Sequence, residues 1–166
     1  HVTGVTADFI SGGEAHASGA EAIAAGNEAI VIDSTVTKDI YGGLAFAPVG
    51  TAIAMGNSVI LSGGAVGGDI YGGVSALSDG TGVGGSATGN SVTISGTPSL
   101  ANSRLYGGIV RNGTDPLEVR AGDAFSGNTL NMETSGLTVR GLYNFQKINF
   151  YLPSSPAAGD TVLTTT

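Results

Sequence analysis

Two short stretches, GNSVILSGG at residues 56–64 and GDIYGG at residues 68–73, carry the pattern that decides the fold. In the first, Val59 and Leu61 lie on one side of an alternating run, and in the second Ile70 and Gly72 do the same. Alternation with period two predicts β-strands with one buried face. The glycines where the two stretches meet, Gly63, Gly64, Gly67 and Gly68, predict turns. Because both stretches recur along the chain, their repetition carries the fold prediction.

The first stretch recurs as a Gly-Asn motif at Asn27, Asn57, Asn90 and Asn128, at intervals of 30, 33 and 38 residues. The second recurs as DIYGG at 39–43 and 69–73 and as RLYGG at 104–108, with degenerate copies at 9–13 and 141–144. The intervals vary between a Tyr-Gly-Gly and the next Gly-Asn, as loops do on a stacked scaffold. We expect any binding specificity in these loops, at residues 44–55, 74–88 and 109–126.

Short strands repeating every 30 residues or so predict an all-β fold, a right-handed parallel β-helix (β-solenoid) with coils of about 30–38 residues. A β-sandwich gives no reason for side chains to repeat at this interval, and propeller blades are longer and more aromatic. We predict a solenoid repeat region at 1–143, with units starting near residues 10, 27, 57, 90 and 128. Residues 144–166 are expected to form a C-terminal capping or linking segment.

The alternation also predicts which side chains face the interior. Around the Gly-Asn motif the inward residues are Ala29, Val31, Val59, Leu61, Val92, Ile94, Leu130 and Met132, and a third apolar position precedes each Asn, at Ala24, Ala54, Ala87 and Phe125. Around the Tyr-Gly-Gly motif they are Ile40, Gly42 and Leu44, then Ile70, Gly72 and Val74, then Leu105, Gly107 and Ile109. The tyrosines alternate with this set and are expected to point outward as an exposed column. The asparagines are expected at corners, in left-handed backbone, with their amides stacked.

Composition and charge restrict the possible partners. The chain of 166 residues contains 29 glycines, 11% charged residues and no cysteine, and its net charge is −7. Residues 1–103 contain eight acidic residues and one basic residue, Lys38, whereas residues 104–166 contain five of each. This balance disfavours nucleic acid and anionic membrane surfaces as partners. With no apolar run of 18 residues, we expect this segment not to span a membrane.

The repeated GNSVxI/LSG followed by GDIYGG resembles the β-helical passenger regions of bacterial autotransporters, over about residues 10–143. The resemblance implies a secreted, surface-displayed scaffold or adhesin of a Gram-negative bacterium, at the cell surface or in the extracellular space. It implies anchoring through a parent chain that continues to an outer-membrane barrel. The partner would be a host or neighbouring-cell surface protein or glycan. On this reading the protein is not an enzyme.

Two sets of stacked side chains are candidates for chemistry. Tyr41, Tyr71, Tyr106 and Tyr143 form the candidate binding column, since aromatic columns can stack sugar rings or meet a protein partner. Asp39 and Asp69 occupy equivalent positions and are weak metal candidates, and we interpret them as solvated turn residues. A polysaccharide lyase or hydrolase is the alternative function, but such sites usually gather three or more acidic groups. We predict no catalytic residue, no metal and no cofactor.

The tail generates the first testable prediction. Five large apolar residues lie within eight positions, at Phe145, Ile148, Phe150, Tyr151 and Leu152. If they cover the open end of the last coil, deleting residues 145–166 exposes that end and its unpaired strand edge. The truncated chain should melt at a lower temperature and aggregate, as followed by thermal unfolding and size-exclusion chromatography. A truncated chain that stays monomeric and equally stable would show that the tail is only a linker.

Overall fold

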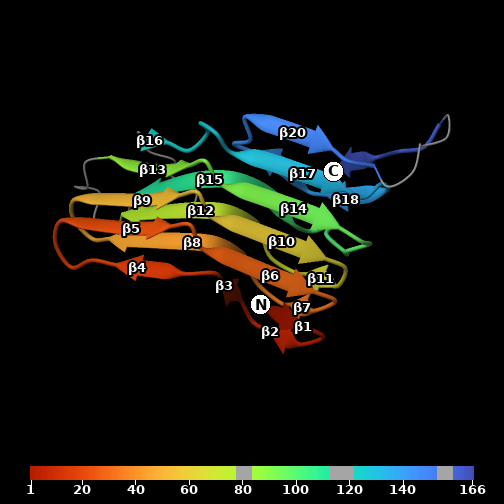
Figure 1. Ribbon diagram of the computed structural model, residues 1–166, viewed down its shortest axis with the longest axis horizontal. Coiled ribbons are helices and arrows are strands. Elements are labelled where there is room, and N and C mark those ends of the chain that lie inside the picture. Colours follow the sequence, from red (N-terminus) through yellow and green to blue (C-terminus); the bar gives the residue numbers. More distant parts are fainter. Residues whose placement is uncertain (78–83, 113–121, 153–158) are drawn as a thin grey trace.

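The chain is a parallel β-helix, as the repeats predict (Figure 1). The computed structural model describes residues 1–77, 84–112, 122–152 and 159–166. Every strand pair in this part of the chain is parallel and joins successive turns of the chain. Within these ranges the structure contains no helix.

One six-stranded sheet contains the strand that follows each Gly-Asn motif. Its order is β1 (Val2–Thr3), β6 (Glu28–Ile32), β10 (Ser58–Ser62), β14 (Ser91–Ser95), β17 (Thr129–Glu133) and β20 (Lys147–Phe150). A second sheet of six strands contains the Tyr-Gly-Gly motif. It comprises β19 (Gly141–Tyr143), β15 (Arg104–Asn112), β12 (Ile70–Leu77), β8 (Ile40–Ala47) and β3 (Ile10–Ser11), with β4 (Glu14–His16) also pairing with β8.

Three smaller sheets complete the coils. A four-stranded sheet contains β16 (Gly122–Asp123), β13 (Gly85–Thr88), β9 (Thr51–Met55) and β5 (Glu21–Ala25). The short strands β11 (Ala65–Val66), β7 (Thr35–Val36) and β2 (Thr6–Ala7) form the third side of the early coils. Strand β18 (Leu137–Val139) pairs with β21 (Leu163–Thr165). A coil therefore has a fourth short strand besides the three that the repeat pattern indicates.

The register places equivalent residues of successive repeats side by side. Val59 pairs with Ala29 and Val92, and Ile70 pairs with Ile40 and Leu105. The residues predicted to face inward around the Gly-Asn motif are buried, from Ala29 to Met132. Full burial of a Leu, Ile or Val side chain contributes roughly 1.5–3 kcal/mol, so these columns supply much of the stability.

The interior is divided into two lobes. The larger is filled by the Val, Leu and Ile columns, among them Val31, Leu61 and Ile70. The smaller lies between the four-stranded sheet and the second half of the Tyr-Gly-Gly strands, and alanines such as Ala45, Ala54 and Ala87 dominate it. Small side chains let the two walls of this lobe approach closely.

The asparagine ladder (Asn27, Asn57, Asn90 and Asn128) binds each coil to the next. The Oδ1 of Asn90 accepts the backbone N–H of Asn57 at 2.9 Å and its Nδ2 at 3.1 Å, and Asn128 does the same for Asn90. The Nδ2 of Asn90 also donates to the Ala54 carbonyl at 3.1 Å. Asn57, Asn90 and Asn128 are buried, so these bonds satisfy polar groups that water cannot reach.

The backbone of the ladder differs from the prediction in one respect. Left-handed backbone occurs at the glycine before each asparagine, for example Gly56 with φ 63° and Gly89 with φ 64°, and not at the asparagine itself. Glycine adopts this conformation without steric cost. The asparagine is thereby free to turn its amide into the interior.

The two glycines of each Tyr-Gly-Gly lie against the ladder. A Cβ at Gly73 would lie 2.6 Å from the Asn90 amide nitrogen, and one at Gly43 would lie 2.4 Å from the Asn57 amide carbon. The preceding Gly72 has no room either, because its Cβ would lie 2.5 Å from the Gly107 carbonyl oxygen. At the waist between the two lobes, the asparagine amides and the backbone of the next coil therefore leave no room for a side chain at the glycine positions.

The glycine pair also shifts the alternation, and this overturns part of the inward prediction. On β8, Ile40 faces the large lobe but Ala45 and Ala47 face the small one, so inward positions change from even to odd numbers. Leu44, Val74 and Ile109, predicted to face inward, instead pack with the tyrosines on the outside. Glu14, the register partner of Leu44, is likewise outside and exposed.

Phe125 and two residues of the tail also depart from the simple pattern. Phe125 was predicted to follow Ala24, Ala54 and Ala87 into the interior, but it is 49% exposed, and Ala124 is buried in the small lobe instead. In the tail, β20 adds to the first sheet, with Ile148 beside Leu130 and Phe150 beside Met132. Both Ile148 and Phe150 are about half exposed there, at 43% and 51%.

Replacing an asparagine of the ladder should lower the free energy of unfolding far more than replacing an asparagine that points outward. Asn90→Ala leaves the buried N–H and Nδ2 donors of Asn57 without an acceptor. Each such group costs about 1–3 kcal/mol, so we expect the free energy of unfolding to fall by about 3 kcal/mol or more. Asn131→Ala is the matched control, because within the described ranges this half-buried Asn bonds the side chains of Thr93 and Asn149, and it should lose less than about 1 kcal/mol. Urea unfolding of both variants measures the difference. Equal losses would contradict the structural role of the ladder.

Candidate functional site

The tyrosine column (Tyr41, Tyr71, Tyr106 and Tyr143) is a continuous stack of rings. Neighbouring ring centroids lie 5.3, 4.8 and 4.8 Å apart, and neighbouring planes differ by only 8°, 16° and 19°. The spacing follows from the strand register, because hydrogen-bonded strands lie about 4.8 Å apart. The backbone ladder therefore holds the rings face to face, each covering the face of the next.

The column is less exposed than the alternation predicts. Tyr71 is buried, with 4% of its surface exposed, Tyr41 and Tyr106 are half-buried, and Tyr143 is 43% exposed. The cause is the shift at the glycine pair, which turns Leu44, Val74 and Ile109 outward beside the rings. The guanidinium of Arg111 covers the column further, with its central carbon 4.8 Å from the centre of the Tyr71 ring. Tyr71 is therefore a packing residue and not a contact surface.

Asp39 and Asp69 hold the column in place. The Oδ1 of Asp39 accepts the backbone N–H of Asp69 at 2.8 Å, and its Oδ2 accepts the hydroxyl of Tyr41 at 2.8 Å. Asp69 repeats the arrangement, accepting the N–H of Arg104 at 2.8 Å and the hydroxyl of Tyr71 at 3.3 Å. Both are partly buried, so the expectation of solvated turn residues is wrong. Each carboxylate joins two coils.

Burial and the neighbouring carboxylates keep the tyrosine hydroxyls neutral. Burial, with the hydrogen bond to Asp39, raises the pKa of Tyr41 to about 12. Burial raises the pKa of Tyr71 and of Tyr106 as well, and the charge of Asp69 acts in the same direction on both. The hydroxyls of Tyr41 and Tyr71 therefore act as hydrogen-bond donors to Asp39 and Asp69 at physiological pH.

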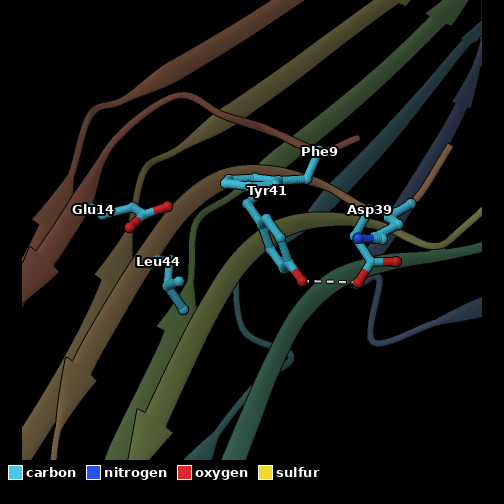
Figure 2. A pocket seen from close by; sticks show the side chains of 6 residues that line it. Phe9, Glu14, Asp39, Tyr41 and Leu44 are labelled. Carbon is cyan, nitrogen blue, oxygen red and sulfur yellow. Dashed lines mark hydrogen bonds between the residues drawn. The ribbon is translucent and has the colours of Figure 1, made fainter. Parts of the chain in front are cut away.

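A pocket with a volume of about 310 Å³ lies at the N-terminal end of the column. We call it the end pocket; its lining residues are Phe9, Glu14, Lys38, Asp39, Tyr41 and Leu44. Phe9 and Glu14 belong to the first coil, whereas Asp39, Tyr41 and Leu44 belong to the next (Figure 2). Ser11, the register partner of Tyr41, carries no ring, so the tyrosine column ends at Tyr41, which lines the pocket.

Charged groups border the end pocket. Lys38 pairs with Asp8 at 3.2 Å, and Glu14 lies 3.3 Å from the Nε2 of His16 on the exposed surface. The hydrogen bonds from Lys38 and Thr37, with the lysine charge, lower the pKa of Asp8. Among the described residues, no group of three or more His, Cys, Asp or Glu side chains could hold a metal ion.

The structure thus brings together only part of what the sequence singles out. Asp39 and Tyr41 share the end pocket, whereas Tyr71, Tyr106 and Tyr143 continue the column away from it. Sequence reasoning missed Phe9 and Glu14, although Phe9 occupies the position of Asp39 in a degenerate first repeat. That irregularity was the available signal. The variable loop predicted at residues 44–55 is wrong in most of its length, because residues 44–47 belong to β8 and 51–55 to β9. Of the other two predicted loops, residues 78–83 and 113–121 lie outside the described residues.

Comparisons with protein-family models, curated proteins and solved structures gave no match. In the part of the chain that the structure describes, no helix is long and apolar enough to cross a membrane. What bears on function is therefore the architecture of the solenoid and the arrangement of its side chains.

The bonds of the two aspartates lead to a graded prediction. In the double variant with Asp39→Asn and Asp69→Asn, each amide oxygen can still accept the N–H of the next coil. The Nδ2 group that replaces the second carboxylate oxygen cannot accept the tyrosine hydroxyl, which has to turn and accept from it. With the loss of charge, this change should cost about 1 kcal/mol per site. Asp39→Ala instead leaves the N–H of Asp69 without an acceptor and should lower the free energy of unfolding by about 1–3 kcal/mol at a single site. Chemical unfolding orders the variants, and an alanine variant as stable as the wild type would show that these bonds carry no weight.

Proposed function

We propose that this chain is a segment of a secreted, surface-displayed autotransporter passenger that acts as a rigid scaffold or adhesin. One observation carries the proposal: the repeated residues of both motifs are used to join coil to coil. The asparagines bond the next amide, the aspartates bond the next N–H, and the tyrosines stack on one another. Such a repeat favours length and rigidity, the properties that a displayed stalk requires.

The composition supports secretion of this kind. The chain has no cysteine, so no stray disulfide can form while it is exported unfolded. Each folded coil offers an unpaired strand edge to the coil that follows, so the solenoid can fold progressively outside the cell. The resemblance of the GNSVxI/LSG and GDIYGG repeats to autotransporter passengers points the same way.

The alternative, a polysaccharide-active β-helix, finds less support. General acid–base catalysis needs a carboxyl group free to exchange a proton with the substrate. The oxygens of Asp39 and Asp69 are instead occupied by backbone and tyrosine donors of the scaffold. Glu14 is the remaining carboxylate of the end pocket, and a hydrolase of this type usually requires a pair.

Surface display is directly testable in the organism that produces the parent protein. Antibodies against residues 1–166 should label intact cells, and treating the cells with an external protease should abolish the label. An antibody against a cytoplasmic protein gives the control for cell integrity. Label that appears only after permeabilisation would contradict display.

The alternative function is tested on the purified chain, which should release no reducing ends from polysaccharides. A release that the Asp39→Asn and Asp69→Asn double variant abolishes would favour the enzyme.

A further inference from the structure

Within the tyrosine column, the faces of the inner rings are covered by the neighbouring rings. Tyr71 and Tyr106 are each covered on both sides by neighbouring rings at 4.8–5.3 Å, so only their edges remain available. Tyr41 is the first ring of the stack, and Ser11 is its partner on the preceding coil. The face of Tyr41 that turns toward the first coil therefore has no tyrosine against it. A ligand that stacks on this column has to stack at an end.

The free face of Tyr41 forms part of the wall of the end pocket. Ser11 stands where a ring would continue the column, and the strand spacing leaves room there for one ring. Phe9, which is 56% exposed, lies beside this space, and Leu44 adds an apolar side chain from the same coil as Tyr41 (Figure 2). The volume of about 310 Å³ suits a single six-membered ring with its substituents.

The polar groups at the rim restrict the chemistry of the ligand. Among the described residues, Glu14 has one carboxylate oxygen near His16 and the other without a hydrogen-bond partner. Lys38 provides an ammonium group, whose partner Asp8 is itself exposed. The oxygens of Asp39 are already occupied. The rim therefore combines a free acceptor with a donor, and the carboxylates of Glu14 and Asp39, with Asp8 beside Lys38, repel an anionic ligand.

We propose that the end pocket binds an uncharged pyranose ring of a glycan, stacked on the free face of Tyr41. The apolar face of the sugar packs on Tyr41 and Phe9, and its hydroxyls bond Glu14 and Lys38. An aromatic side chain of a protein partner could occupy the same space, but it would leave both polar groups of the rim unused. The inference deepens the adhesin role in the proposed function and rests on that function for its biological meaning.

Binding is tested on the purified chain of residues 1–166, so its failure is separate from a failure of surface display. The probes are neutral trisaccharides of glucose, galactose, mannose and N-acetylglucosamine, followed by saturation-transfer NMR with irradiation of the aromatic protons. At least one probe should receive saturation on ring protons of a single sugar unit. The proposal is overturned if no trisaccharide receives saturation up to its solubility limit, or if only a phenylalanine-containing peptide does.

Variants then place the site. Ser11→Tyr adds the missing ring to the column, so it should abolish binding of the active trisaccharide while leaving the melting temperature equal or higher. Glu14→Gln keeps the shape of the pocket and should weaken the Kd about two- to tenfold, as expected for one weakened hydrogen bond. Phe125→Ala removes a ring that is about as exposed as that of Phe9 but lies outside the pocket, so it should leave the Kd unchanged. Unchanged binding in Ser11→Tyr would overturn the assignment, since the stability readout shows that this variant is folded.

Discussion

The contact between the asparagine ladder and the glycine pairs is the constraint on which the rest of this structure depends. Each ladder amide occupies the waist of a coil, where it bonds the amide of the next coil and a carbonyl of the smaller lobe. The amide fits there only because the opposite strand carries no side chain at the second glycine of Tyr-Gly-Gly. The two motifs, whose contacting residues are 14 to 20 positions apart in the sequence, are thus two halves of one contact, which explains why they recur in step.

The same contact determines what the outer surface presents. Because both glycines face the waist, the alternation of the strand shifts by one residue, and Leu44, Val74 and Ile109 turn outward. These residues pack beside the tyrosines and reduce the exposure of the column. The aspartates that precede β8 and β12 then fix the hydroxyls of Tyr41 and Tyr71. A structural repeat in the interior therefore generates an ordered aromatic stack on the exterior.

Most of the fold could be predicted from the sequence because, in a solenoid, residues one repeat apart are register partners on neighbouring strands. The parallel stacking, the burial of Val59 and Leu61, and the tyrosine stack all follow from residues spaced by one coil. Ile109 was misplaced because period-two reasoning assumes that every residue advances the alternation, and a pair of glycines breaks that assumption. Phe125 was misplaced because Ala124, one residue earlier, is small enough for the narrow lobe. The end pocket was missed because it arises where the repeat fails, and repeat analysis finds only what recurs.

A double-mutant cycle on Gly73 and Asn90 tests the central contact most directly. Gly73→Ala alone should be strongly destabilising, because the added Cβ would lie 2.6 Å from the Asn90 amide nitrogen. Asn90→Ala removes the obstacle, so the double variant should be more stable than the sum of the single losses predicts, by about 1–3 kcal/mol in urea unfolding. Losses that simply add would show that the glycine and the asparagine do not depend on each other, and would contradict this account.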